Sequence, residues 1–155
     1  MQRYIFAAFL VLQLLSPSTA TAATAATAAE ATDENPDDKG IRACLQAYLD
    51  GTSYNDPELI RSAFYSDARL FLSHPEEDIW IVSIDEYAGF FANREKGKPS
   101  GREGEILSID RTGEIATAKA EIRSTSNEAR YIDLFLLKKI DGDWKIISKS
   151  ATRTH

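Results

Sequence analysis

The C-terminal half of the chain constrains the fold most, because it consists of four β-type runs joined by short polar turns. The connections are Thr112-Gly113, residues 125–128 and Asp141-Gly142. Connections this short join antiparallel strands, and Asp-Gly between apolar runs is typical of a tight hairpin. The sequence therefore predicts an antiparallel meander with strands at residues 105–111, 114–124, 130–140 and 143–152.

The pattern of apolar residues indicates how these strands are covered. In the second strand, Ala116, Ala118, Ala120 and Ile122 alternate with polar residues, which predicts one packed face and one wet face. Residues 131–137, "YIDLFLL", are apolar in both phases. We therefore expect a central strand covered on both faces, one by helices or a cavity and the other by a second subunit.

Three amphipathic helices are predicted before the meander. The first spans residues 41–52, and the second begins at Asp56-Pro57-Glu58, an N-cap acceptor followed by a proline at the first helical position. The third follows Ser83, which forms a capping box with Glu86. Two short β-type runs, residues 68–74 and 79–83, lie between the second and third helices. Three helices followed by a long meander predict an α+β domain in which a curved, mainly antiparallel sheet packs on the helices.

The N-terminal residues have the pattern of an export signal. Arg3 precedes an apolar run at residues 4–15, and Ala20-Thr21-Ala22 fits a cleavage site. The alternative is an uncleaved anchor helix, but the run is shorter than the roughly 20 residues that span a membrane. We predict a signal peptide over residues 1–22, export to the periplasm or the extracellular space, and no membrane span after cleavage.

The segment after the signal holds no large apolar side chain and ends in an acidic cluster. Such a composition cannot bury enough apolar surface to fold. We therefore predict a disordered acidic tether over residues 23–38 and a single folded domain over residues 39–155.

Charge and cysteine content exclude several classes of partner. The net charge of −6 and the lack of a dense Lys/Arg run argue against a nucleic-acid partner. Cys44 is the only cysteine, so no intrachain disulfide can form. Cys44, His74 and His155 show no metal-ligand spacing, and we predict neither a metal site nor a cofactor.

Five short motifs accompany this order of elements: Tyr48-x-x-Gly51, Phe64-x-x-Asp67-Ala68, residues 115–122, Tyr131-x-Asp133 and Asp141-Gly142-x-Trp144-Lys145-Ile146. With these motifs, the chain resembles the NTF2-like superfamily of cone-shaped α+β barrels, and within it the SnoaL-like and "putative lumazine-binding" group. The resemblance covers residues 39–152 and implies a conical pocket between helices and sheet and a homodimer formed through the sheet. It implies no single activity, because this fold hosts isomerases, cyclases, dehydratases and transport adaptors.

Ketosteroid isomerase, a member of this superfamily, combines an aspartate base with an oxyanion hole made of a tyrosine and a protonated aspartate. Tyr48 resembles its first-helix tyrosine in position. The same register, however, places Leu72 where that enzyme carries its base. His74 could replace the base, although its neighbours "PEED" indicate an exposed turn.

Asp133 is the second polar candidate, because it is the one charged residue in an otherwise apolar strand. A buried carboxylate needs a partner, and Arg61 or Arg130 could pair with it; alternatively, it lines the entrance of the cavity. Tyr48 could be a core tyrosine whose hydroxyl bonds Asp133 or the backbone.

Three functional hypotheses follow from these residues. The first is a dimeric binding protein for a small, partly apolar molecule, without strong catalysis. The second is an isomerase or cyclase-type enzyme in which Asp133 or His74 transfers protons and Tyr48 is the oxyanion donor. The third is a protein-interaction module with a filled cone. The predicted ligand-binding residues are Tyr48, Trp80, Tyr87, Phe91, Tyr131, Asp133 and Phe135.

Overall fold

The computed structural model describes residues 35–74, 76 and 78–154. The predictions of a signal peptide and of a tether up to residue 34 lie outside the described residues. None of the described helices is long and apolar enough to cross a membrane. The elements are, in chain order, α1 (Pro36–Ser53), α2 (Pro57–Ala63), β1 (Phe64–Leu72), β2 (Trp80–Ser83), α3 (Ile84–Ala92), β3 (Arg102–Thr112), β4 (Ile115–Ser124), β5 (Ala129–Ile140) and β6 (Asp143–Thr154).

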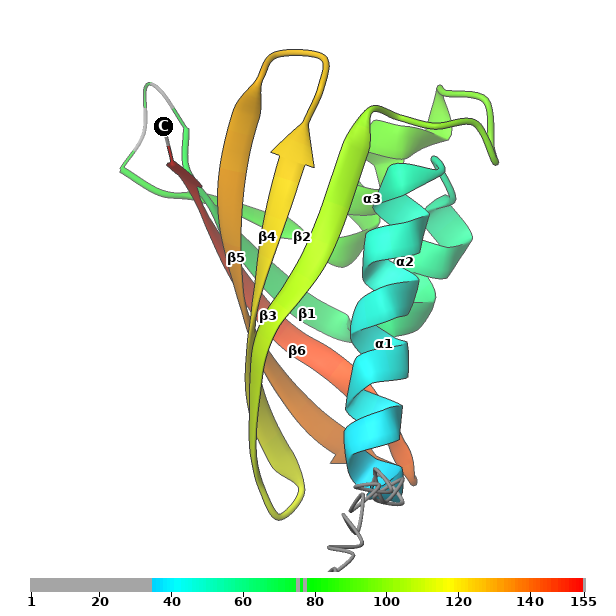
Figure 1. Cartoon of the computed structure of the whole chain (residues 1–155), viewed down its shortest axis with the longest axis vertical. Coiled ribbons are helices and arrows are strands. Elements are labelled where there is room, and N and C mark those ends of the chain that lie inside the picture. Colours follow the sequence, from blue (N-terminus) through cyan, green and yellow to red (C-terminus); the bar gives the residue numbers. More distant parts are fainter. Residues whose placement is uncertain (1–34, 75, 77, 155) are drawn as a thin grey trace, which may run out of the picture. The chain divides into compact units, whose positions relative to one another are not determined.

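The six strands form one curved, unclosed sheet in the order β2-β1-β6-β5-β4-β3. All neighbouring strands are antiparallel except β1 and β6, which run parallel. The three helices lie on one face of this sheet (Figure 1). The predicted α+β architecture, with three helices on a curved and mainly antiparallel sheet, is confirmed.

The first helix begins three residues before the domain start that the sequence predicted. Asn35 caps it by accepting a hydrogen bond from the backbone N–H of Asp37 at 2.9 Å, and Pro36 occupies the first helical turn. This is the same cap, proline and acid signature that correctly predicted the start of α2 at Asp56. Residues 36–38 thus belong to the helix and not to the tether.

Gly51 belongs to the last turn of α1 and allows α2 to pack closely against it. A Cβ atom at this position would lie 2.7 Å from Cγ1 of Ile60 and 2.8 Å from its backbone nitrogen. Ile60 is fully buried. The glycine is therefore explained by this close approach.

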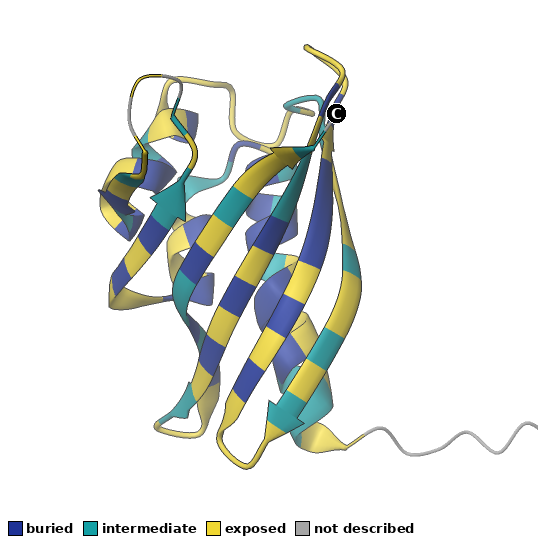
Figure 2. Cartoon of the chain, turned by 90° about the vertical axis from the view of Figure 1, so that its left-hand side faces the viewer, coloured by how far each residue is buried: buried dark blue, intermediate teal, exposed yellow. Residues whose placement is uncertain are grey.

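The faces of the meander follow the predicted alternation in β4, where Ala116, Ala118, Ala120 and Ile122 are all buried (Figure 2). In β5 the inner face is covered as predicted, with Asp133 and Phe135 buried, whereas the cover of the outer face by a second subunit stays a prediction. Leu134 and Leu136 point to the outer face and are 52% and 40% exposed. Helices cover only the inner face of the sheet, so the outer face has no covering element within the described part of the chain.

Two irregularities change which side chains face inward. The register between β5 and β6 shifts at Ile147, since Leu137 pairs with Ile146 and Leu136 pairs with Ser148. The β3–β4 register shifts in the same way at Leu107. A bulged residue inverts the alternation beyond it, and in β6 this turns Lys149 toward the core.

Candidate functional site

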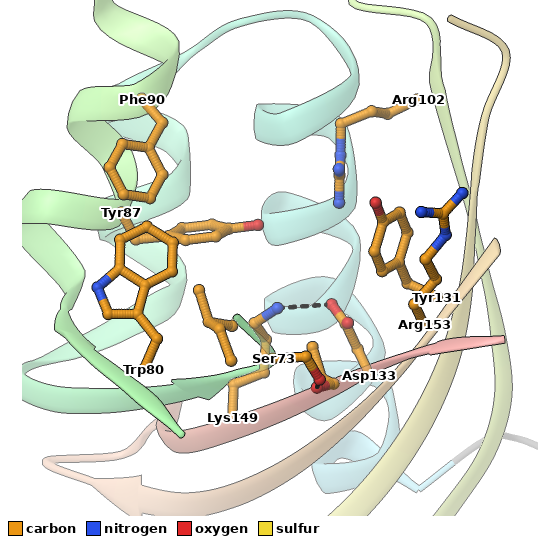
Figure 3. A pocket seen from close by; sticks show the side chains of 11 residues that line it. Ser73, Trp80, Tyr87, Phe90, Arg102, Tyr131, Asp133, Lys149 and Arg153 are labelled. Carbon is orange, nitrogen blue, oxygen red and sulfur yellow. Dashed lines mark hydrogen bonds and ion pairs between the residues drawn. The ribbon is translucent and has the colours of Figure 1, made fainter. Parts of the chain in front are cut away.

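A cavity of about 260 Å³ lies between the inner face of the sheet and the α3 and β2 side of the domain (Figure 3). This volume is near the lower end of the roughly 300–1,000 Å³ of small-molecule pockets. Larger hollows exist near the ends of α1, but this one combines an aromatic wall with convergent polar groups. It is lined by Leu72, Ser73, Trp80, Tyr87, Phe90, Arg102, Tyr131, Asp133, Lys149, Ala151 and Arg153.

A buried ion pair forms the floor of the cavity. The Lys149 Nζ donates a hydrogen bond to Oδ2 of Asp133 at 2.8 Å, and both side chains are 2% exposed. In the sheet, Asp133 lies opposite Ala120 on β4 and Ala151 on β6. These small neighbours leave room beside the carboxylate for the long lysine side chain.

Two tyrosines complete the polar network around this pair. The Tyr48 Oη donates to Oδ2 of Asp133 at 2.7 Å and lies 3.1 Å from Oη of Tyr87. Because Tyr48 uses its one proton on Asp133, Tyr87 is the donor in the second bond. The ammonium of Lys149 also lies 5.3 Å from the ring centre of Tyr48 and 5.0 Å from that of Tyr87. We call Tyr48, Tyr87, Asp133 and Lys149 the Tyr-Asp-Lys network.

This network is electrically balanced, which makes its burial tolerable. The positive charge of Lys149 offsets the negative charge of Asp133, and the hydroxyl of Tyr48 supplies a further hydrogen bond. Burial, with the nearby Asp133 carboxylate and Tyr87, raises the pKa of Tyr48 well above its ordinary value. Tyr48 is therefore protonated, and its hydroxyl hydrogen is donated to Asp133 inside the core.

The opposite wall of the cavity is aromatic. Trp80 of β2 stacks on Phe90 of α3 with ring centres 5.5 Å apart and 26° between the planes. Tyr87 meets Phe90 edge to face at 5.9 Å. Positions 87 and 90 are three residues apart and share one side of α3. The wall can therefore contact a flat apolar molecule.

Arg102, at the start of β3, extends over the cavity and forms no ion pair with an acid in the described part of the chain (Figure 3). Its Nε is buried and has no hydrogen-bond partner, and the guanidinium lies 6.0 Å from the ring centre of Tyr131. Burial lowers the pKa of this guanidinium, but Tyr87, Tyr48, Asp133 and Tyr131 together raise it by more. Arg102 is thus a permanent positive charge in the cavity wall.

The sequence of the chain matches the model of one protein family. The model of the family described as "Putative lumazine-binding" matches residues 36–150, which is nearly the whole described domain. The chain belongs to this family. No curated protein matches it.

Solved structures with the same fold are NTF2-like proteins. An NTF2-like protein of unknown function from Shewanella baltica is 25% identical, with a TM-score of 0.68 over 77% of this chain and 94% of that one. One from Methylobacillus flagellatus is 25% identical, with a TM-score of 0.67 over 79% and 97%. A ketosteroid isomerase-like protein from Erwinia carotovora atroseptica is 19% identical, with a TM-score of 0.57 over 78% and 98%, and shares the fold.

In this member of the "Putative lumazine-binding" family, four of the predicted ligand-binding residues line the cavity: Trp80, Tyr87, Tyr131 and Asp133. Three others lie elsewhere. Tyr48 is fully buried behind Asp133, and Phe135 is buried against the ring of Tyr48 at 5.4 Å. Phe91 lines an adjoining hollow instead.

Of the three catalytic candidates, Tyr48 and Asp133 are brought together and His74 is not. His74 packs edge to face on Trp80 at 5.6 Å and accepts a hydrogen bond at Nδ1 from the backbone N–H of Glu76. It lies beside the cavity wall and not in its lining. Leu72, at the position where the family resemblance expects a base, is an apolar part of that lining.

One predicted hydrogen-bond partner of Asp133 is found in the structure, and two others are not. The hydrogen bond from Tyr48 to Asp133 is confirmed. The alternative pairing of Asp133 with Arg61 or Arg130 is wrong, because Arg61 bonds to Asp85 and Arg130 bonds to Glu121. Lys149 takes their place.

Sequence reasoning missed the cationic residues of the cavity, Arg102, Lys149 and Arg153, together with Phe90 as a wall residue. Lys149 could not be found, because simple alternation from Trp144 and Ile146 places it outside. For Phe90, the available signal was its position three residues after Tyr87 on the predicted third helix. Among the described residues, no group of three or more His, Cys, Asp and Glu side chains could hold a metal ion.

Proposed function

We propose that this protein is an exported NTF2-like protein that binds a small, partly apolar molecule in the cavity, without strong catalysis. The main support for this proposal is the cavity, where the stacked pair Trp80 and Phe90 faces a few convergent polar groups. The description of its family also supports a small-molecule ligand. Tyr87, Tyr131 and Asp133 would contact this ligand directly, while Tyr48 and Phe135 would support the floor.

The arrangement of the polar groups favours binding over proton transfer. The Tyr48 hydroxyl is directed at Asp133 and is fully buried, so it is not available to a ligand carbonyl. Oδ2 of Asp133 already accepts hydrogen bonds from Lys149 and Tyr48, so this oxygen is occupied and does not face a ligand as a free acceptor. Leu72 offers no base in the position expected from ketosteroid isomerase.

Fluorescence of the two tryptophans tests this proposal. Trp80 lies in the cavity wall, whereas Trp144 is buried at the other end of the domain against Asp37. In a Trp144→Phe variant, Trp80 is the single reporter, and a bound aromatic molecule should change its emission in a saturable manner. The panel should include lumazine, because of the family description, and neutral and charged bicyclic compounds.

The matched control is Trp80→Phe, in which only the remote Trp144 reports. We expect no saturable change in this variant at ligand concentrations that saturate the first. Equal changes in both variants, or none in either for the whole panel up to millimolar concentration, would count against binding in this cavity.

We also propose that two copies associate through the outer face of the sheet. Support comes from Leu107, Ile115, Leu134 and Leu136, all between 40% and 52% exposed on β3, β4 and β5. A Leu134→Glu variant should be monomeric in multi-angle light scattering where the native protein is a dimer. Ile79→Glu, which charges an equally exposed residue before β2, should remain dimeric. A native monomer would refute the proposal.

Export is proposed from the sequence of residues 1–22. The test is N-terminal sequencing of the protein recovered from the exported fraction of its own host. We expect a mature chain that begins near Ala23, and recovery of the chain with Met1 in the cytoplasmic fraction would contradict this proposal.

A further inference from the structure

The charge of the cavity is opposite to that of the whole protein. The chain carries a net charge of −6, yet the cavity is lined by Arg102, Lys149 and Arg153 against a single acid, Asp133. Lys149 is neutralised by Asp133 at 2.8 Å. The positive charges of Arg102 and Arg153 are therefore in excess.

Arg102 differs from the four arginines of the described domain that form ion pairs. Arg61, Arg111, Arg123 and Arg130 each form an ion pair with a carboxylate. No such pair is formed by Arg102, whose buried Nε also has no hydrogen-bond partner in the described part of the chain. A partly desolvated cation without an acceptor costs free energy, and an anionic ligand would supply the missing acceptor.

A second hollow, of about 270 Å³, adjoins the first and shares Tyr87, Phe90, Arg102 and Tyr131 with it. Its other residues are mainly polar: Phe91, Arg94, Ser100, Ser124, Ser126 and Asn127. The guanidinium of Arg102 thus lies where an apolar compartment meets a polar one. A ligand with one apolar end and one charged end matches this division.

We infer that the ligand is a carboxylic acid with a flat apolar body, whose carboxylate binds Arg102 and whose body packs on Trp80 and Phe90. This inference rests on the proposed binding function and specifies its ligand class. The planar guanidinium presents paired N–H donors that match a carboxylate. Arg153, which pairs with Tyr131 across β5 and β6, adds a second positive charge at the wall (Figure 3).

The test compares 2-naphthoic acid with 2-naphthamide, which have the same ring and nearly the same size but differ in charge. Isothermal titration at pH 7 should show the acid binding at least about 10-fold more tightly to the native protein. Arg102→Gln should weaken acid binding by about 10- to 100-fold, as expected for a charged hydrogen bond. The same variant should leave amide binding within about threefold, since the amide makes no ionic contact.

Arg111→Gln is the matched control, because it removes one arginine from the same strand at a site outside the cavity. It should leave both affinities unchanged. If Arg102→Gln fails to fold, Arg102→Lys replaces it, because lysine retains the charge without the planar guanidinium. Arg102→Lys should weaken acid binding by less than the about 10- to 100-fold expected for loss of the charge.

The outcomes separate this inference from the proposed function. If the amide binds as tightly as the acid, or if the preference survives Arg102→Gln, the carboxylate inference is overturned while binding in the cavity stands. If neither compound binds at millimolar concentration, the inference is overturned and the proposed function is contradicted as well.

Discussion

Removing one member of the buried ion pair should destabilise the fold far more than removing both. The change Lys149→Met keeps an unbranched side chain out to the ε position and deletes the ammonium. Asp133 then remains 1% exposed, with Tyr48 as its only hydrogen-bond donor among the described residues. In the double variant Lys149→Met/Asp133→Leu, no charge is left in the core, and Tyr48 keeps its contact with Tyr87.

The expected magnitude follows from the burial of the pair. Breaking a fully buried ion pair by deleting one partner costs about 3–5 kcal/mol, whereas replacing both partners by apolar residues is often neutral or stabilising. Lys149→Met should therefore lose about 3–5 kcal/mol of unfolding free energy, out of about 5–15 kcal/mol for a typical domain. At roughly 4 °C per kcal/mol, Tm should fall by about 12–20 °C. The double variant should lie within about 1 kcal/mol of the native protein.

Urea unfolding followed by circular dichroism at pH 7 measures these differences, with Asp133→Leu completing the double-mutant cycle. We expect a coupling energy of several kcal/mol between the two positions. The reasoning would be refuted by a Lys149→Met variant within 1 kcal/mol of the native protein, or by effects that simply add in the double variant.

Three further predictions concern buried polar groups. Because burial, Asp133 and Tyr87 raise the pKa of Tyr48 well above 10, the folded state retains a proton that the unfolded chain loses, so stability should fall as pH rises above about 10. Tyr48→Phe should flatten this fall in urea titrations from pH 9 to 11, and an unchanged slope would contradict the assignment. Burial raises the pKa of the Cys44 thiol to about 11, and its Sγ donates to the Ala63 carbonyl at 3.1 Å; its reaction with Ellman's reagent at pH 8 should be at least ~100-fold slower in the folded protein than in urea. Arg102→Met should raise the unfolding free energy of the ligand-free protein by about 1 kcal/mol, because it removes an unpaired, partly buried charge; a loss of stability would show that Arg102 has a structural role.

The fold could be predicted from the sequence because its local signals agree with its packing. Asp141 and Gly142 both adopt positive φ, 51° and 92°, as the predicted tight hairpin requires. The N-cap of Asp56 and the capping box of Ser83 are formed as predicted. Signals of this kind depend on neighbours in the chain, so one sequence is enough to recognise them.

The candidate site could be predicted only in part, because its side chains depend on irregularities in the strands. Tyr131 and Asp133 lie in a regular strand, and their shared face was readable from alternation. Lys149 faces inward only because Ile147 is bulged, and no residue in this segment is typical of a bulge. Arg102 lies three residues before the strand predicted at residues 105–111, because the start of β3 follows a run rich in glycine and lysine.

The sequence predicts the start of the folded domain three residues too late. The early start of α1 came from a cap at Asn35 that lies within an otherwise acidic stretch.

Native mass spectrometry of the protein purified from its own host tests the central claim most directly. Spectra under gentle and then denaturing conditions should be compared with those of Ala151→Phe, which places a ring in the cavity opposite Asp133. The account predicts one small molecule released per subunit from the native protein and none from the variant. Release of the same molecule in equal amount from both proteins would contradict binding in this cavity.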